Sequence, residues 1–406
     1  MSIERYLVIS PDFPPPFIGG SLVYINTLVN NSNEAFDVLT SKSQVTEHST
    51  RKFAHKEIRT KFLVKSNDPS KIRLFISYTY LIIWTTFKML TNPYKLVVAN
   101  PGAIGNSILF ILGKFLGFKV VGIAYAEELT IPLKTNGIKN IIKRKIIKYS
   151  YKRASGFIVV CHFCKNLLVN EFSVNEKSID VIPSCLSLEK FSKEKNINKT
   201  KNSIISVGRL IERKGFHLLI NSVVRLQKKI PDLSLIIVGD GPMKVKLKSL
   251  IEKQNAENFI KLKKSVNDEE LKDLYQKTQL FVLANYQLIN GDTEGCPSVF
   301  SEAMNYGMPI IGGKNAGVDT AIIDGENGII INSIIPKELD EAIFYLLSNV
   351  EVMEKMITAG KKKLLRDHHP DSVGALFANS LNRFDKNEFS IGFQRDFNRA
   401  VPSVNI

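Results

Sequence analysis

The sequence contains few cysteines. Among its 406 residues there are four, Cys161, Cys164, Cys185 and Cys296. So low a count excludes a disulfide-stabilised scaffold and favours a reducing compartment. Cys161 and Cys164 form a C-x-x-C pair, a spacing found in half of a zinc site and in redox pairs. Because no second pair of ligands follows at a suitable spacing, we expect both to be buried or partly buried thiols, and we expect no metal site.

Long apolar runs and a leader sequence are missing as well. Residues 74–87 (LFISYTYLIIWTTF) form an apolar run of about 14 residues, whereas a membrane-spanning helix needs about 20. We expect this run to be a buried helix of the N-terminal half, with partial insertion into one leaflet as the alternative. The N-terminus has no basic segment followed by an apolar stretch and a cleavage site, so we expect no signal peptide.

Acidic residues are scarce relative to basic ones, and the net charge is +16. Residues 1–190 hold 25 Lys and Arg against 13 Asp and Glu, a net +12, which leaves +4 for the rest. Much of the excess lies in residues 134–153, where basic residues alternate with Ile and Tyr in the pattern of an amphipathic helix. An anionic membrane surface would suit this helix, since each basic residue near anionic lipid contributes about 1 kcal/mol. A solvated helix in a lysine-rich protein explains the pattern equally well.

The charge has two further implications. No nucleic-acid recognition motif accompanies the basic segment, so we expect no nucleic-acid partner. The cysteine content and the charge together favour a cytoplasmic location, with peripheral attachment to the inner face of the cell membrane as the alternative to a freely dissolved protein.

The length and the alternation of strands and helices predict two α/β domains. A strand is expected over residues 6–10, followed by a glycine loop and a helix over 21–29, which is how an open parallel sheet begins. The polar stretch 191–202 reads as an interdomain linker. We therefore expect an N-terminal domain at 1–190, a C-terminal domain at 203–375 and a helical tail at 376–406.

Further strands are predicted by short apolar runs between helical stretches. In the first domain they lie at residues 96–99, 119–124, 156–160 and 179–182, and in the second at 203–207, 234–238, 259–262, 280–283, 310–312 and 328–331.

The most informative segment of the chain is residues 294–303, which reads EGCPSVFSEA. Its two carboxylates, Glu294 and Glu302, stand eight residues apart, the first in a Gly/Pro loop and the second where a helix begins its apolar run. A loop that enters a helix offers N–H groups and the positive end of a dipole, which suit an anion. Ionised carboxylates accept hydrogen bonds from hydroxyl groups. Phosphate and sugar held in these two ways are what a nucleotide-sugar site requires.

This segment resembles the E-x7-E motif of the retaining GT-B glycosyltransferases, in particular glycosyltransferase family 4. Other elements of that family occur in the family's order, and the good matches cover residues 200–335. They are VGRL at 207–210 with Lys-Gly at 214–215, IVGDGP at 237–242, GMPII at 307–311 and DGENG at 324–328. The resemblance implies two Rossmann-like domains with parallel sheets that face a central cleft. It also implies metal-independent transfer of a sugar from a nucleotide-diphosphate donor to a hydroxyl.

The resemblance implies roles for particular residues of the C-terminal half. Arg209 and Lys214 would contact the donor diphosphate, Glu302 would bind the ribose hydroxyls, and Glu294 would lie near the donor sugar. Arg209, Lys214 and Glu294 are therefore the candidate catalytic residues. The remaining candidates for donor binding are loop residues with available backbone groups: Gly19, Gly20, Gly295, Cys296, Pro297 and Ser298.

The N-terminal half departs from the family at the acceptor side. Many members carry a His after the strand that matches residues 120–124, where this chain has Tyr125. Tyr125, Glu127 and Glu128 are our candidates for contact with a glycan or lipid-linked glycan acceptor. Residues 184–187 read SCLS where the family usually has NGVD.

Two alternatives to a transferase stay open at this point. One is a nucleotide-sugar 2-epimerase or hydrolase with the same fold, because fold alone does not determine function. The other is an inactive, membrane-peripheral subunit of a glycan assembly complex. An active member of the family would take part in the biosynthesis of a surface polysaccharide, a lipopolysaccharide or a glycolipid.

Overall fold

The computed structural model describes the greater part of the chain as two compact units. The first, here called the N-terminal domain, ends at Cys185 and resumes at His369; the second, the C-terminal domain, extends from Leu186 to His368. The described residues are 5–13, 20–42, 55–64, 68–91, 94–100, 104–134, 138–186, 198–264, 266–314 and 317–388.

The described part of the N-terminal domain contains a seven-stranded sheet in the order β3-β2-β1-β4-β5-β6-β7, with every pair of neighbours parallel. Its inner strands are buried along their whole length, as expected for a parallel sheet with both faces covered. The strands are β1 (Tyr6–Ile9), β2 (Phe36–Ser41), β3 (Lys56–Thr60), β4 (Val97–Ala99), β5 (Val120–Ala124), β6 (Gly156–Val159) and β7 (Ile179–Val181).

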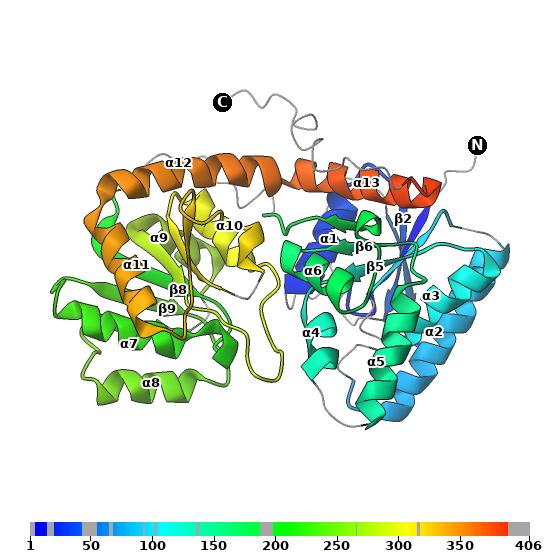
Figure 1. The fold of residues 1–406 in the computed structure, drawn as a ribbon, viewed down its shortest axis with the longest axis horizontal. Coiled ribbons are helices and arrows are strands. Elements are labelled where there is room, and N and C mark those ends of the chain that lie inside the picture. Colours follow the sequence, from blue (N-terminus) through cyan, green and yellow to red (C-terminus); the bar gives the residue numbers. More distant parts are fainter. Residues whose placement is uncertain are drawn as a thin grey trace. The chain divides into compact units, whose positions relative to one another are not determined.

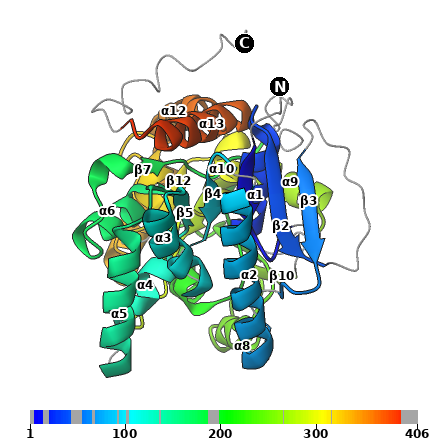
Figure 2. The same cartoon turned by 90° about the vertical axis from the view of Figure 1, so that its right-hand side faces the viewer.

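Helices cover this sheet, and the last of them comes from the C-terminal end of the chain (Figures 1 and 2). They are α1 (Gly20–Asn31), α2 (Lys71–Thr91), α3 (Ile104–Leu116), α4 (Glu127–Lys134), α5 (Ile138–Tyr151), α6 (His162–Asn170) and α13 (Pro370–Lys386). α13 packs closely on α1, since a Cβ at Gly374 would come within 1.9 Å of the Asn31 carbonyl oxygen. A buried ion pair between Arg383 and Asp180 ties α13 to β7.

In the C-terminal domain the described residues form a six-stranded parallel sheet in the order β10-β9-β8-β11-β12-β13. The strands are β8 (Thr200–Val207), β9 (Ser234–Val238), β10 (Ile260–Lys263), β11 (Thr278–Leu283), β12 (Ile310–Gly313) and β13 (Gly328–Ile331). The helices are α7 (Phe216–Gln227), α8 (Lys244–Lys253), α9 (Asp268–Lys277), α10 (Ser298–Asn305), α11 (Pro336–Ser348) and α12 (Val350–Asp367) (Figure 1).

Glycines let the loops at the carboxyl ends of β8 and β9 touch. A Cβ at Gly239 would stand 2.0 Å from the carbonyl oxygen of Gly208. Gly215 has φ +68°, and a Cβ there would meet the Ala284 carbonyl oxygen at 1.8 Å. Only glycine allows backbones to approach this closely, and in doing so it brings the loop after β8 against the segment after β11.

The strands predicted from the sequence are present, with ends shifted by up to three residues. β2 and β3 were not predicted. The prediction of a buried helix over residues 74–87 was wrong about burial. α2 does form, but its buried residues are Ser77, Leu81, Thr85 and Met89, and most of its larger apolar side chains are exposed. The basic amphipathic helix predicted within 134–153 is α5.

None of the helices among the described residues combines the length and the apolar character needed to cross a bilayer.

Candidate active site

Glu294 lies at the centre of a cluster of opposite charges in the C-terminal domain. Its carboxylate accepts a hydrogen bond from Lys214 Nζ at 2.9 Å and another from Arg213 Nε at 2.6 Å. Arg213 Nη1 also donates to Asp292 Oδ1 at 2.7 Å. Arg213 and Lys214 sit on a 3-10 turn (Glu212–Lys214) after β8, and Glu294 lies in the loop before α10. The fold thus joins two motifs that are 80 residues apart in the sequence.

Burial and charge act in opposite directions on this cluster. Only 8% of Glu294 is exposed, and burial alone would raise the pKa of its carboxyl. The charges of Lys214 and Arg213 outweigh burial and hold the pKa of Glu294 below its usual value. For Arg213, burial opposes the charged form, but Glu294 and Asp292 raise its pKa further. Glu294 and Arg213 are therefore ionised together at neutral pH.

Backbone hydrogen bonds fix the loops that carry the cluster. The Tyr286 N–H donates to the Arg213 carbonyl at 2.9 Å, and the Gly317 N–H donates to the Glu294 carbonyl at 3.3 Å. The Lys214 side chain passes over Gly208, where a Cβ would come within 3.4 Å of Lys214 Cε. Glycine at 208 thus leaves room for the lysine stem, and the ammonium group is held by the Glu294 carboxylate.

Arg209 differs from the other cations of this region. Its side chain is exposed, and it forms no hydrogen bond or ion pair with any residue that the structure describes. It follows β8 and lies next to Gly208, over which Lys214 passes. Arg209 is therefore an available cation beside a buried, fully paired one.

Glu302 lies on α10, the helix that begins four residues after Glu294. One of its carboxylate oxygens, Oε2, accepts a hydrogen bond from the hydroxyl of Tyr275 at 3.0 Å. Burial and the nearby Glu302 charge raise the pKa of Tyr275 well above its usual value, so the tyrosine remains a donor. Tyr275 also stacks on Tyr306, with ring centroids 5.3 Å apart. The half-buried carboxylate of Glu302 is thus oriented by a rigid aromatic pair.

The loop that connects Glu294 to α10 carries the remaining candidates for donor binding in the C-terminal domain. Pro297 is the N-cap residue of α10 with extended backbone, and Ser298, the first helical residue, is exposed. Gly295 and the free thiol Cys296 are half-buried.

Three residues of the candidate site were not predicted from the sequence. Arg213 shares Glu294 with Lys214, Asp292 completes the pairing of Arg213, and Tyr275 orients Glu302. Arg213 stands next to Lys214 in the stretch ERKG, so the doubled cation was a signal in the sequence. Tyr275 is far from the motifs, and its role depends on the packing of α9 near α10.

The predicted acceptor-side residues lie in the N-terminal domain. The Glu128 carboxylate accepts from the N–H groups of Tyr125 at 2.6 Å and Ala126 at 3.3 Å, and from the Asn100 amide at 3.2 Å. Glu128 therefore satisfies backbone donors at the start of α4. Burial raises the pKa of Glu128, and burial together with the Glu128 charge raises that of Tyr125.

Three other predicted site residues are placed only in part. Glu127 opens α4, but its side chain lies outside the described part of the structure. Gly20 is the first residue of α1, and Gly19 lies outside the described residues.

The described residues contain no group of three or more His, Cys, Asp and Glu side chains arranged to hold a metal ion. Cys161 and Cys164 are buried with their sulfur atoms 3.3 Å apart, and the Cys164 thiol donates to the Tyr125 carbonyl at 3.0 Å. The prediction that both are buried thiols is confirmed.

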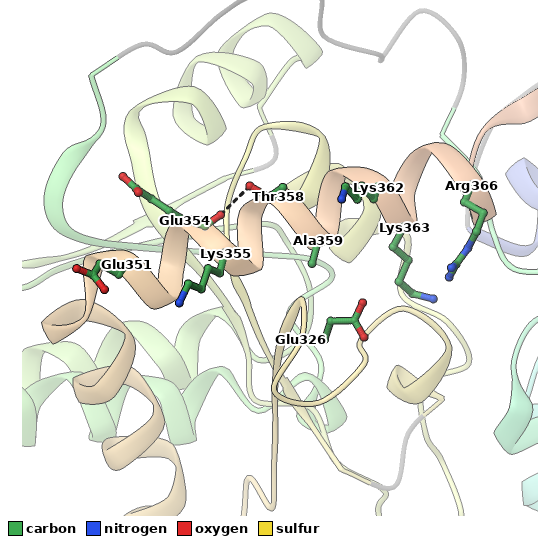
Figure 3. Close-up of a pocket in the computed structure, with 9 residues that line it drawn as sticks. All are labelled: Glu326, Glu351, Glu354, Lys355, Thr358, Ala359, Lys362, Lys363 and Arg366. Atoms are coloured by element: carbon green, nitrogen blue, oxygen red, sulfur yellow. Dashed lines mark hydrogen bonds between the residues drawn. The ribbon is translucent and has the colours of Figure 1, made fainter. Parts of the chain in front are cut away.

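A hollow on the surface of α12 is separate from these residues (Figure 3). Figure 3 shows side chains of one face of α12 around it, with Glu326 reaching in from the loop before β13. Both acidic and basic groups line it, and Lys363 already pairs with Asp367 at 2.8 Å. Its lining residues are Glu326, Glu351, Glu354, Lys355, Thr358, Ala359, Lys362, Lys363 and Arg366. Such a mixed and partly paired lining is typical of a solvated helix surface, and none of the predicted site residues contributes to it.

The sequence is similar to those of known glycosyltransferases. Residues 187–363 match the family described as glycosyl transferases, group 1. An uncharacterized glycosyltransferase of Methanocaldococcus jannaschii is 24% identical over 367 residues, which cover 84% of this chain and 89% of that protein.

Two solved structures resemble the fold. Sucrose-phosphate synthase of Thermosynechococcus elongatus has a TM-score of 0.72 at 16% identity, covering 95% of this chain and 99% of that one. HepE of Anabaena, solved with UDP and glucose, has a TM-score of 0.66 at 14% identity, covering 93% and 99%.

These findings confirm the predicted fold class, two Rossmann-like α/β domains of the GT-B type. The family match also spans Lys214, Glu294 and Glu302. The C-terminal domain, over residues 187–363, belongs to the glycosyl transferases group 1 family, also known as glycosyltransferase family 4.

Proposed function

We propose that this protein is a retaining hexosyltransferase that moves a sugar from a nucleotide-diphosphate donor to an acceptor hydroxyl. The observation that carries the proposal is the pairing of Lys214 with Glu294, in which the two motifs meet around a buried carboxylate. A buried charge cluster of this kind is costly to maintain for stability alone, because desolvation offsets most of the Coulombic gain. Its placement beside the available cation Arg209 favours a role in binding an anion.

The donor would bind at the carboxyl ends of β8 and β11. Arg209 and Lys214 would contact its diphosphate, with N–H groups between Gly295 and Ser298 as additional donors. Glu302 would accept hydrogen bonds from the two ribose hydroxyls through oxygens already oriented by Tyr275. Glu294 would lie near the sugar, where its charge is fixed by two cations. The HepE structure supports a donor of this class, because it holds UDP and glucose on a similar fold.

The chemistry that these groups would support is substitution at the anomeric carbon. The acceptor hydroxyl oxygen forms a bond to that carbon, and the bond from the carbon to the diphosphate oxygen breaks. The hydroxyl proton passes to the departing diphosphate on the same face, which retains the configuration. Negative charge accumulates on the leaving group as this happens. Fixed cations such as Arg209 and Lys214 stabilise that charge more in the transition state than in the ground state.

The acceptor is proposed to be a glycan or lipid-linked glycan in the biosynthesis of a surface polysaccharide, lipopolysaccharide or glycolipid. Tyr125 and Glu128, at the end of β5 and the start of α4, are the candidate residues for its recognition. Glu128 already caps α4 through its carboxylate, so Tyr125 is the more available of the two.

Thermal stabilisation by a panel of UDP-, GDP-, ADP- and CDP-sugars tests donor binding. A ligand of the folded state raises stability by RT ln(1 + [L]/Kd). We expect one nucleotide sugar to stabilise the protein with and without EDTA, and to lose this effect in Glu302→Ala. Donor consumption without an acceptor product would instead indicate a hydrolase or epimerase. The absence of any stabilising nucleotide sugar would indicate an inactive subunit.

A further inference from the structure

α2 exposes many of its large apolar side chains instead of burying them. Its inward face carries Ser77, Leu81, Thr85 and Met89, at the helical spacing of four residues. Its opposite face carries large apolar side chains, and among them Ile72 is 74% exposed and Phe75 is 72% exposed. The other exposed apolar residues of α2 are Ile76, Ile83, Phe87 and Leu90. Soluble proteins rarely expose so many apolar side chains on one stripe unless something covers them.

Two neighbouring helices extend this apolar surface. α3 packs beside α2, and α5 packs beside α3, so that α3 lies between the other two (Figure 2). Exposed apolar side chains continue along α3 and α5: Ile108, Phe115, Leu116, Ile141, Ile142, Ile146 and Tyr149. We call the exposed residues of α2, α3 and α5 the three-helix face.

The charge of these helices has one sign. The sequences of α2, α3 and α5 contain no Asp and no Glu. Their basic residues include Lys114 on α3 and Lys143 and Lys145 on α5, all of them exposed. On α5, Ile142, Ile146 and Tyr149 follow the i, i+4, i+7 spacing of one helical face, and lysines alternate with them.

We propose that the three-helix face docks onto an anionic lipid bilayer, with its helices lying in the plane of the interface. Apolar side chains on a helix surface enter the boundary between headgroups and acyl chains, while basic residues bind anionic lipid. This mode of binding needs no helix that crosses the membrane, and none of the described helices is long and apolar enough to do so.

The charge of the three-helix face favours a bilayer over two other occupants, a second copy of the chain and a different protein. A second copy of the chain would bring the lysines of α5 into the same interface as their own counterparts. A protein partner is disfavoured because lysine is depleted in protein–protein interfaces, whereas it is frequent on this face. A bilayer satisfies both the apolar surface and the positive charge.

Co-sedimentation of the full chain with vesicles tests the proposal. The protein should bind phosphatidylcholine vesicles that contain phosphatidylglycerol, and bind pure phosphatidylcholine vesicles much more weakly. Ile76→Glu with Ile83→Glu, two outward positions on α2, should weaken binding more than a hundredfold, since each isoleucine would no longer enter the apolar phase. Lys143→Gln with Lys145→Gln should weaken binding about fivefold per charge.

Matched variants on the C-terminal domain control for hydrophobicity and charge. Val245→Glu with Ile334→Glu changes two exposed apolar residues there, and Lys246→Gln with Lys248→Gln removes two exposed charges from α8. Both pairs should bind vesicles like the unchanged chain. The chain's one tryptophan, Trp84 on α2, gives a second readout through energy transfer to dansyl-labelled lipid.

Three results would overturn the proposal. The first is the absence of binding to anionic vesicles. The second is equal loss of binding in the α2 pair and in its C-terminal control. The third is a dimer in solution that Ile76→Glu with Ile83→Glu converts to monomer while vesicle binding is unchanged, which would identify a second copy as the occupant.

Vesicle binding does not require the proposed donor site. A Glu302→Ala variant that binds no nucleotide sugar should still bind anionic vesicles. The α2 pair should still be stabilised by the donor, so failure of either proposal can be recognised without the other.

Discussion

The two domains differ in how they treat their surfaces and their charges. In the C-terminal domain, exposed helices carry both signs, and pairs such as Lys248–Glu252 and Lys337–Glu341 lie one helical turn apart. In the N-terminal domain, α2, α3 and α5 carry one sign only and expose apolar side chains. The first surface suits water, and the second suits the anionic bilayer proposed above. The comparison teaches that the domain without the family motifs can still be interpreted, from the charge and apolar character of its surface.

The largest effect is expected from removing the buried carboxylate of the C-terminal domain. Glu294→Ala leaves Arg213 and Lys214 without their shared partner, and loss of one side of a buried ion pair costs about 3–5 kcal/mol. The free energy of unfolding from urea titration measures this. Glu252→Ala removes an exposed partner of Lys248 and should change the stability little. Equal effects of the two variants would show that the Glu294 cluster does not differ from a surface pair.

A second pair of variants tests which face of α2 is buried. Leu81→Ala removes a fully buried side chain and should destabilise the protein by about 2–5 kcal/mol. Ile83→Ala, two residues later, removes a side chain that is 64% exposed and should change the stability by less than about 0.5 kcal/mol. The same urea titrations apply. If Ile83→Ala were the more destabilising of the two, α2 would have the opposite face buried.

Arg209→Ala should separate catalysis from stability. Because this exposed side chain forms no hydrogen bond or ion pair with described residues, its loss should leave the unfolding midpoint unchanged. The kcat for transfer should fall about a hundredfold, the usual result of removing one group that stabilises transition-state charge. Steady-state kinetics at saturating donor measure this. A rise in KM with no change in kcat would instead assign Arg209 to ground-state binding.

The smallest effect is a dependence of stability on pH. The pKa of Glu294 is lowered in the folded protein, so its contribution to stability is complete above the unfolded value of about 4.3. That contribution is lost as the pH falls through the lower, folded pKa. Unfolding midpoints measured from pH 6 downward should therefore fall more steeply for the unchanged chain than for Glu294→Gln. Parallel curves would mean that Glu294 does not titrate as the structure implies.

The sequence predicted the C-terminal domain more completely than the N-terminal one. β9 and β13 match their predicted ranges because each is a short apolar run bounded by glycine or polar residues. β2 and β3 were missed for different reasons. Asp37 interrupts the apolar run of β2, and it pairs with Arg5 in the structure. β3 (KEIRT) is an edge strand whose charged residues resemble a loop.

The candidate site could be predicted where the chemistry is local in sequence. Lys214, Glu294 and Glu302 belong to motifs, and the structure joins the first two directly. The role of Tyr275 depends on the packing of α9 near α10, which no local pattern reports. The exposure of α2 could not be predicted either, since composition shows how apolar a helix is and not which of its faces is covered.

The measurement that tests the central claim most directly is an NMR assay of sugar transfer. The protein is incubated with the stabilising nucleotide sugar and an acceptor glycan in the presence of EDTA, and the anomeric configuration of the product is compared with that of the donor. We predict a product with retained configuration, formed without added metal and formed about a hundredfold more slowly by Arg209→Ala. A product of inverted configuration, or a donor that is only hydrolysed or epimerised, would contradict the account.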